Sequence, residues 1–370
     1  MRALLLGYYG ARNLGDDMML HCILQWLAMQ GMGVTVVSED PPETEKRFSV
    51  PVVRNVALLG QWGWRDSWFR GHALRLIRMI RSNDLLVVGG GDLIRDDKGW
   101  RTLWYTIEKI IVALMFGKKV YLLNIGIVAP VTVIGKMLLR FVLKRCSKII
   151  VRDESSFRTC IQSGNRGSCI LQPDIVLSLP SFLGEGYPAA AKNDAPYILV
   201  CLRMEPNDFG TYPYGEKEIA VLASALDEVC LHSGAKVVFL PFQYDRNNDD
   251  NLIHHKIVQK MRRRESAGVE EWSSDLLRLT GLFRGASCVV AMRLHAAVLA
   301  VAYRRPVVVM PYDRKVTEFA DLVGIRSRVD SKRSGDAGYI EGLITEEMNR
   351  DDAQYNPGTE TDWKSMSLAQ

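Results

Sequence analysis

Short strand-like segments and longer helix-like segments alternate along most of this chain. In the first half, short apolar runs rich in β-branched residues predict strands at Ala3–Leu6, Val34–Val37, Leu85–Val88, Val120–Leu123 and Lys148–Val151. Helical periodicity predicts helices at Gly15–Gln30, His72–Arg81, Arg101–Phe116, Val133–Cys146 and Glu154–Gln162. This alternation is typical of an α/β domain whose parallel sheet is covered by helices on both faces.

The alternation stops at residues 184–196, which are rich in glycine, alanine and proline and predict a linker. It then restarts, with strands expected at Tyr197–Leu202, Lys236–Leu240, Cys288–Ala291 and Val307–Met310. Helices are expected at Glu216–His232, Asn251–Arg263, Ser274–Arg284, Leu294–Tyr303 and Lys315–Val323. We therefore expect two α/β domains, residues 1–183 and 197–350, with parallel sheets facing a cleft, and a polar, flexible tail at residues 351–370.

Charged residues follow three of the strands predicted for the C-terminal domain. Arg293 and His295 lie where the strand at Cys288–Ala291 gives way to a helix, Lys315 follows the next strand, and Arg203 follows the first. Open α/β sheets bind ligands at the carboxyl ends of their strands. Arginine and lysine bind phosphate and carboxylate, and histidine titrates near neutral pH. The pattern predicts a site for a small anion; each residue taken alone also fits a structural role.

Glycines and carboxylates mark strand ends in the N-terminal domain. Gly90 and Gly91 belong to a triple glycine after the strand at Leu85–Val88, which favours close approach of the backbone to a ligand. Asn13 and Asp16 lie where the first helix begins. A carboxylate there already satisfies the helix dipole, so this turn suits a hydroxyl-rich ligand at least as well as a phosphate. Helix capping is the structural alternative.

The composition is that of a globular protein, with 48% hydrophobic and 24% charged residues and a net charge of +5. This mild positive charge fits an anionic ligand or membrane surface, and no nucleic-acid-binding signature is present. The seven cysteines include no C-x-x-C pair and predict buried free thiols in a reducing cytosol. No metal-ligand spacing is visible, and the pair His254-His255 is expected at the surface. The start of the chain does not resemble a signal peptide, so we expect a cytoplasmic protein.

Two basic segments raise the question of a peripheral association with the inner face of the plasma membrane. One is tryptophan-rich and leads into the helix predicted at His72–Arg81, and the other is a row of basic residues in the helix predicted at Val133–Cys146. The alternative for the first, which we favour slightly, is a surface helix packed on the sheet by its apolar face. The residues concerned are Trp62, Trp64 and Trp68 in the first segment and Lys136, Arg140 and Lys144 in the second.

From Leu5 to about Gly324, motifs of the chain follow one another in the order seen in a known family, and the sequence resembles the polysaccharide pyruvyl transferases. The closing pair of motifs is the most specific. The motifs are Gly7-Tyr8-Tyr9-Gly10 with Asn13-x-Gly15-Asp16, Gly89-Gly90-Gly91 with Asp96, Gly126 with Pro130, Val151-Arg152-Asp153-Glu154-Ser155, Pro173-Asp174, Met292-Arg293-Leu294-His295 and Tyr312-Asp313-x-Lys315-Val316. The longer turn at residues 124–130 and Pro311 depart from the family pattern, which weakens any inference about the acceptor.

The resemblance implies a GT-B-like architecture of two Rossmann-like halves. It implies a transferase that moves a pyruvyl group from phosphoenolpyruvate to two hydroxyls of a sugar in an exopolysaccharide or cell-wall precursor, with no cofactor. His295 would be the catalytic acid/base in a phosphoenolpyruvate-binding C-terminal domain. Donor-binding roles would fall to Arg203, Arg293 and Lys315, and acceptor-side or structural roles in the N-terminal domain to Asn13, Asp16, Gly90 and Gly91.

Two other functions stay open at this point. A nucleotide-sugar glycosyltransferase of the same fold would release a nucleotide and would need a surface for base and ribose. A non-catalytic scaffold or sensor of envelope synthesis would bind a sugar or an anion without turnover. An acid/base histidine beside two cations argues against the second, because a binding module does not need one.

Overall fold

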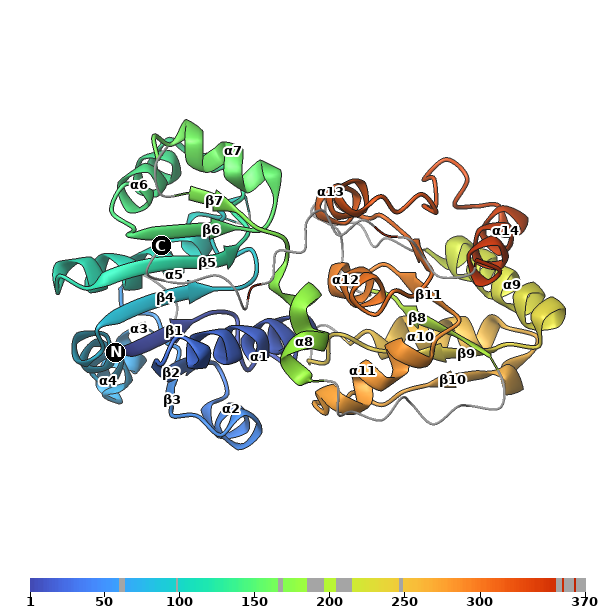
Figure 1. The fold of residues 1–370 in the computed structure, drawn as a ribbon, viewed down its shortest axis with the longest axis horizontal. Helices are drawn as coiled ribbons and strands as arrows, with labels where there is room; N and C mark the ends of the chain where they lie inside the picture. Colours follow the sequence, from blue (N-terminus) through green and yellow to red (C-terminus); the bar gives the residue numbers. More distant parts are fainter. Residues whose placement is uncertain are drawn as a thin grey trace. The chain divides into compact units, whose positions relative to one another are not determined.

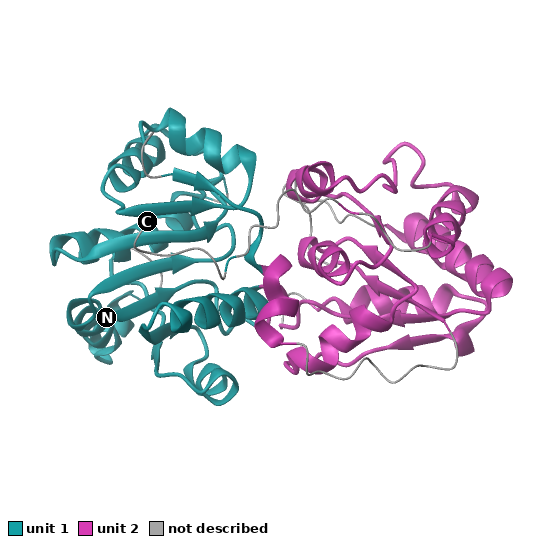
Figure 2. Cartoon of the chain, viewed as in Figure 1, with its two compact units in different colours: residues 1–11, 16–175, 361–370 teal, residues 12–15, 176–360 magenta. Residues whose placement is uncertain are grey.

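The computed structural model describes residues 1–59, 64–97, 99–165, 169–184, 196–203, 215–245, 249–350, 355 and 363. The chain forms two compact units (Figure 2). Unit 1 comprises Met1–Ala11, Asp16–Ile175 and Thr361–Gln370, and unit 2 comprises Arg12–Gly15 and Val176–Glu360. The predicted domains placed the boundary at residue 183, whereas the chain passes to unit 2 after Ile175; residues 185–195 of the predicted linker lie outside the described residues.

Unit 1 is built on a parallel sheet with the strand order β3-β2-β1-β4-β5-β6-β7. The strands are β1 (Arg2–Leu6), β2 (Gly33–Ser38), β3 (Val52–Arg54), β4 (Leu85–Gly89), β5 (Lys119–Ile125), β6 (Lys148–Val151) and β7 (Cys169–Leu171). The five strands predicted for this half are confirmed. The two edge strands β3 and β7, of three residues each, were not predicted.

Helices pack around this sheet and bury their apolar sides against it (Figure 1). They are α1 (Leu14–Met29), α2 (Pro41–Phe48), α3 (Trp64–Phe69), α4 (His72–Ser82), α5 (Trp100–Met115), α6 (Val133–Leu143) and α7 (Glu154–Gln162). Leu76 of α4, Ile107 of α5 and Leu139 of α6 share one core with Leu4 and Leu86 of the sheet. Each such side chain stabilises the fold by roughly 1.5–3 kcal/mol.

Unit 2 has a second parallel sheet, with the strand order β10-β9-β8-β11-β12. Its strands are β8 (Tyr197–Cys201), β9 (Lys236–Phe239), β10 (Ala267–Val269), β11 (Cys288–Ala291) and β12 (Val307–Val309). Its helices are η1 (Ile175–Ser178), α8 (Leu179–Leu183), α9 (Glu216–Ser233), α10 (Asn251–Lys260), η2 (Arg264–Ser266), α11 (Leu276–Gly285), α12 (Leu294–Ala302), α13 (Arg314–Val323) and α14 (Ala337–Met348). All four predicted strands are confirmed; the edge strand β10 and the helix α14 were not predicted.

Two residues of the predicted flexible tail are described, and both are packed. The Trp363 ring is buried edge-on against Trp26, with 5.8 Å between ring centroids, and its Nε1 donates to the carbonyl of Pro173. The hydroxyl of Tyr355 accepts a hydrogen bond from the backbone N–H of Val307. At these two positions the segment predicted as a flexible tail is packed, one by a buried ring and the other by a hydrogen bond, while the rest of residues 351–370 lies outside the described residues.

Candidate functional site

The carboxyl edge of the unit 2 sheet carries the residues singled out as an anion site. β8, β11 and β12 are neighbours in this sheet and run parallel. Arg203 follows β8, Arg293 and His295 follow β11, and Lys315 follows β12. The structure therefore places all four at one edge, as expected, while their chemical roles remain predictions.

Arg293 is held in a buried ion pair at this edge. It lies at the N-cap of α12, and its Nε donates to Oδ2 of Asp250 over 3.1 Å while its Nη2 donates to Oδ1. Oδ2 of Asp250 also accepts the backbone N–H groups of Phe242 and Gln243, each over 3.0 Å. Arg293 thus joins the start of α12 to the loop after β9, and the N–H groups of its Nη1 lie outside this pair. The sequence did not single out Asp250.

A segment from the start of the chain packs on unit 2 beside the loop that follows β9. Asn13 pairs with Gln243 in an antiparallel bridge, and its Nδ2 donates to Gln243 Oε1 over 2.7 Å. The N–H of Leu14 donates to the carbonyl of Phe242 over 2.9 Å. Asn13 therefore docks this segment on the loop after β9, a contact different from the helix capping considered in the sequence, and its acceptor-side role stays a prediction.

Gly15, in the same segment, lies directly against His295. A Cβ atom at Gly15 would come within 2.1 Å of Nδ1 of the imidazole, a distance that real Cβ atoms do not reach. Any larger residue would displace the ring or the segment. His295, the second residue of α12 and half-buried, is thus fixed on one side by a residue that must be glycine.

Arg203 and Lys315 are linked through the loop that follows β12. The guanidinium of Arg203 lies over the ring of Tyr312, 4.7 Å from its centroid, and donates to the Tyr312 hydroxyl. Asp313 caps α13 by accepting from the N–H of Val316, and its Oδ2 is 3.5 Å from Nζ of Lys315. The Lys315 side chain is 35% exposed, so its ammonium can be reached by a ligand.

His254 was expected at the surface, and that expectation is wrong. It lies on the buried face of α10, its Nε2 accepts from the N–H of Leu202, and its ring packs 5.2 Å from that of Phe239. Burial lowers its pKa to about 4, because the charged imidazolium loses its hydration. Only its neighbour His255 is exposed. His254 therefore supports the backbone immediately before Arg203.

The lowered pKa of His254 predicts acid destabilisation. Between pH 6.5 and about 4 the unfolded chain binds a proton at His254 more tightly than the folded one, so this stability is complete above pH 6.5 and is lost as the pH falls towards 4. We expect His254→Gln, whose amide oxygen can still accept from Leu202, to lose roughly 2–3 kcal/mol less than the wild type over this interval. Urea unfolding at pH 7 and pH 4 measures this, and equal losses in both proteins would contradict it.

The carboxyl edge of the unit 1 sheet is formed by glycines and carboxylates. Gly90 and Gly91 both have φ +75, a region that favours glycine, so a side chain there would strain the turn after β4. A Cβ atom at Gly91 would also lie 3.3 Å from Oδ1 of Asp16. Gly90 and Gly91 therefore let the backbone pass close to the Asp16 carboxylate, while the close approach to a ligand predicted for this turn stays a prediction.

A buried arginine, Arg152, connects two more carboxylates at this edge. Its Nη2 donates to Oδ1 of Asp92, and its Nη1 lies 3.6 Å from Oδ2 of Asp174. Asn124 holds Asp174 in place by donating to the carbonyl of Pro173 and accepting from the N–H of Ile175. Sequence reasoning noted Arg152 and Asp174 only as motif pieces, because nothing in the sequence shows that they meet.

Asp96, named above only as part of the glycine-turn motif, is buried and has a structural role. Its carboxylate accepts from the N–H groups of Val131 and Thr132 and from the Thr132 hydroxyl. It thereby fixes the turn that begins α6. Within the described ranges no group of three or more His, Cys, Asp or Glu is arranged to hold a metal ion.

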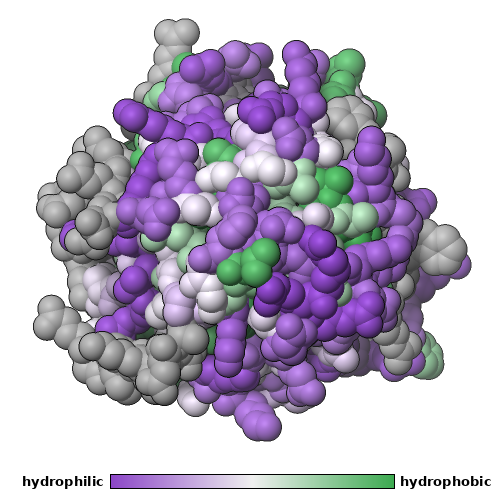
Figure 3. Space-filling model, turned by 90° about the vertical axis from the view of Figure 1, so that its right-hand side faces the viewer, coloured by the Kyte–Doolittle hydropathy of each residue, from purple (hydrophilic) through white to green (hydrophobic). Residues whose placement is uncertain are grey.

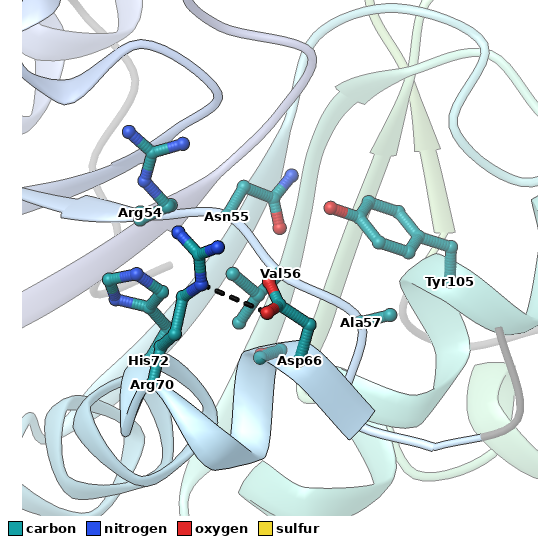
Figure 4. Close-up of a pocket in the computed structure, with 9 residues that line it drawn as sticks. Arg54, Asn55, Val56, Ala57, Asp66, Arg70, His72 and Tyr105 are labelled. Carbon is teal, nitrogen blue, oxygen red and sulfur yellow. Dashed lines mark hydrogen bonds and ion pairs between the residues drawn. The ribbon is translucent and has the colours of Figure 1, made fainter. Parts of the chain in front are cut away.

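A cavity of about 410 Å³ lies in unit 1 at the carboxyl end of β3 (Figure 4). Arg54 ends β3, Arg70 and His72 flank the start of α4, and Tyr105 reaches in from α5. Nε of Arg70 donates to Oδ1 of Asp66 over 2.9 Å. Two guanidinium groups, an imidazole and one carboxylate line the cavity, so it suits an anionic or hydroxyl-rich ligand. The sequence had not indicated it.

Residues 13–314 match the family model described as polysaccharide pyruvyl transferase. The matched region includes Arg203, Arg293 and His295 and ends one residue before Lys315. None of the curated proteins compared with the chain matches it in sequence.

Solved structures with a similar fold include sugar-modifying enzymes. The UDP-GlcNAc 2-epimerase from Methanocaldococcus jannaschii is 10% identical, with a TM-score of 0.66 over 96% of this chain and 95% of that chain. The enzyme of the same name from Neisseria meningitidis, bound to UDP-GlcNAc, is 12% identical, with a TM-score of 0.58 over 97% and 96%. The calicheamicin glycosyltransferase CalG4 is 14% identical, with a TM-score of 0.53 over 95% and 90%. At these identities the likeness concerns the fold, and it confirms the predicted α/β class of two Rossmann-like, GT-B-like domains.

Proposed function

The chain belongs to the polysaccharide pyruvyl transferase family, and from this premise we propose that it moves a pyruvyl group from phosphoenolpyruvate to two hydroxyls of one sugar residue. The product would be a pyruvate ketal, with phosphate released. The acceptor would be an exopolysaccharide or cell-envelope precursor, and the chemistry requires no cofactor. The observation that supports this most directly is His295, packed on Gly15 and flanked at neighbouring strand ends by Arg203 and Lys315.

Phosphoenolpyruvate carries a phosphate and a carboxylate on a three-carbon enol, so its site needs cations spaced for two anions. Arg203 and Lys315 are joined through the Tyr312 loop, and we assign them to these groups. Arg293 contributes the Nη1 edge of its guanidinium, oriented by the pair with Asp250. A neutral ligand would gain little from this concentration of positive charge.

Ketal formation requires proton transfers that a histidine can perform. The methylene carbon of the enol takes a proton, and a sugar hydroxyl adds to the central carbon and loses its proton. The bond from this carbon to the phosphate oxygen then breaks, and the second hydroxyl adds to the same carbon, closes the ring and loses its proton to the released phosphate. We assign His295 as the acid/base group for these transfers, since its imidazole follows the strand between those that lead to Arg203 and Lys315.

We place the acceptor saccharide in unit 1. Its strand edge presents the carboxylates of Asp16 and Asp92 beside glycine backbone, and carboxylates accept hydrogen bonds from sugar hydroxyls. The cavity between Arg54 and Tyr105 is a further candidate for part of the acceptor. The assay described below identifies the acceptor sugar and the two hydroxyls that the ketal bridges.

A phosphate-release assay with phosphoenolpyruvate and a panel of saccharides, both free and lipid-linked, tests the proposal. We expect release that depends on one acceptor and a product heavier by one pyruvate ketal. Nucleotide release from a nucleotide sugar in the same assay would instead identify a glycosyltransferase. Binding of phosphoenolpyruvate without release over hours would favour a sensor.

Lys315→Ala should raise the KM for phosphoenolpyruvate roughly 10–100-fold, the equivalent of losing one charge-assisted contact worth about 1.5–3 kcal/mol. Its partly exposed side chain makes a large loss of stability unexpected. Arg314→Ala is the matched control, because Arg314 is the neighbour of Lys315, its side chain is 70% exposed and it pairs with Glu318. Steady-state kinetics with both variants decide the matter, and equal donor KM values would remove Lys315 from the donor site.

A further inference from the structure

Helix α6 exposes an apolar row that is not accounted for by the fold. Its buried side, which includes Leu139 and Val142, packs on the sheet. Val133 is 73% exposed, Ile134 69% and Met137 67%, and Val131, in the turn before the helix, is 67% exposed. Single exposed apolar residues are normal, but a contiguous group this large marks an interaction surface. The face of the molecule in Figure 3 is in contrast largely hydrophilic, with small scattered hydrophobic patches.

A basic row runs alongside these residues. Lys136, Arg140 and Lys144 repeat at the spacing of one helical face and are exposed. The guanidinium of Arg145 lies 3.9 Å from the ring centroid of Phe141, the last exposed apolar residue of the helix. The sequence contains nine Lys and Arg but no Asp or Glu between Glu108 and Asp153. The exposed side of α6 is therefore apolar and cationic, without acidic residues.

We propose that the exposed side of α6, residues 131–145, docks on a bilayer of anionic phospholipid. An interfacial helix inserts apolar side chains at the level of the acyl boundary while basic residues contact the headgroups, and α6 offers both. A second copy of the chain is a poor occupant, because a symmetric contact would bring the basic rows together. None of the helices in the described part of the chain is long and apolar enough to cross a bilayer, so docking would be peripheral.

The way in which α6 is attached to unit 1 suits membrane docking. The buried carboxylate of Asp96 holds the turn at Val131 and Thr132, so the apolar end is fixed rather than frayed. The helix follows β5, so it begins at the carboxyl edge of the unit 1 sheet. Trp100, the first residue of the neighbouring helix α5, is also exposed at this edge. Resting on the function proposed above, such docking would hold a lipid-linked acceptor beside the edge assigned to its sugar.

The tryptophan-rich segment is a weaker candidate for the membrane contact. Trp62 lies outside the described residues, and Trp68 packs against the core of unit 1 while its Nε1 donates to the carbonyl of Leu58. The apolar side of α4 is buried, including Leu76 and Ile80. These contacts agree with the alternative of a surface helix packed on the sheet.

Flotation of the full chain with vesicles of phosphatidylglycerol and phosphatidylcholine tests the docking. We expect wild-type protein to float with phosphatidylglycerol vesicles and not with pure phosphatidylcholine. Ile134→Ser with Met137→Ser should lower the bound fraction at least tenfold. Lys136→Glu with Arg140→Glu should do the same, since each basic residue near an anionic surface contributes about fivefold. The controls Leu231→Ser and Lys332→Glu, exposed residues of unit 2, should bind as wild type.

Flotation of both α6 variants at the wild-type level would overturn the proposal. A wild-type protein that is a dimer in solution, with the dimer lost only in the α6 variants, would also overturn it. Phosphate release from phosphoenolpyruvate with a free saccharide is measured in parallel and should be unchanged in the α6 variants. Flotation without any phosphate release would leave the docking standing while contradicting the proposed function. Phosphate release without flotation would support the proposed function and contradict the membrane docking.

Discussion

Replacing His295 with alanine should lower the rate of phosphate release from phosphoenolpyruvate roughly 10²–10⁴-fold, the usual contribution of a positioned acid/base group. The fall should appear in kcat, because the cations assigned to donor binding, Arg203 and Lys315, are unchanged. Removing a half-buried ring at the second position of α12 should leave the fold intact, which circular dichroism and urea unfolding can verify. Activity within a few-fold of the wild type would contradict the assignment of His295 as the acid/base group.

Two comparison variants show whether the loss reflects proton transfer. His255→Ala removes an exposed histidine of α10 and should leave turnover unchanged. Gly15→Ala keeps the imidazole but places a methyl group where the ring of His295 now lies. Turnover should therefore fall without any loss of a titratable group. If Gly15→Ala were fully active, the contact between this segment and His295 would have no bearing on the chemistry.

The positions of His295, Arg203 and Lys315 could be predicted because they depend on local sequence. A buried β-branched run, the residues that directly follow it and the start of a helix are all neighbours in the chain. In a parallel sheet, strand ends then share one edge whatever the length of the connections between them. That is why these residues were placed correctly from the sequence.

The partners of these residues could not be predicted, because they come from distant parts of the chain. Asn13 docks on Gln243, and Gly15 lies against His295, in each case more than 200 residues further along the chain. Nothing in the sequence distinguishes Asp250, which holds Arg293, from other aspartates that precede a helix. His254 was misplaced for a related reason: two adjacent histidines on a polar helix give no sign of which one faces the sheet.

Breaking the pair between Arg293 and Asp250 should have the largest effect on stability. Asp250→Ala would leave the guanidinium of Arg293 buried without its carboxylate and two backbone N–H groups without their acceptor. Removing one partner of a buried ion pair typically costs about 3–5 kcal/mol. We expect a loss of this size in the free energy of unfolding at pH 7, measured from urea transitions.

The exposed pair between Arg158 and Glu154, at i,i+4 on α7, is the control, and Glu154→Gln should cost less than about 1 kcal/mol. A double variant, Asp250→Leu with Arg293→Met, removes both charges and should recover part of the stability, although the two N–H groups stay without an acceptor. The double variant should be inactive, because the start of α12 loses its orientation and the Nη1 edge of Arg293 is gone. If it had wild-type turnover as well as the recovered stability, Arg293 would be a structural residue only, and the donor would be bound by Arg203 and Lys315 without it.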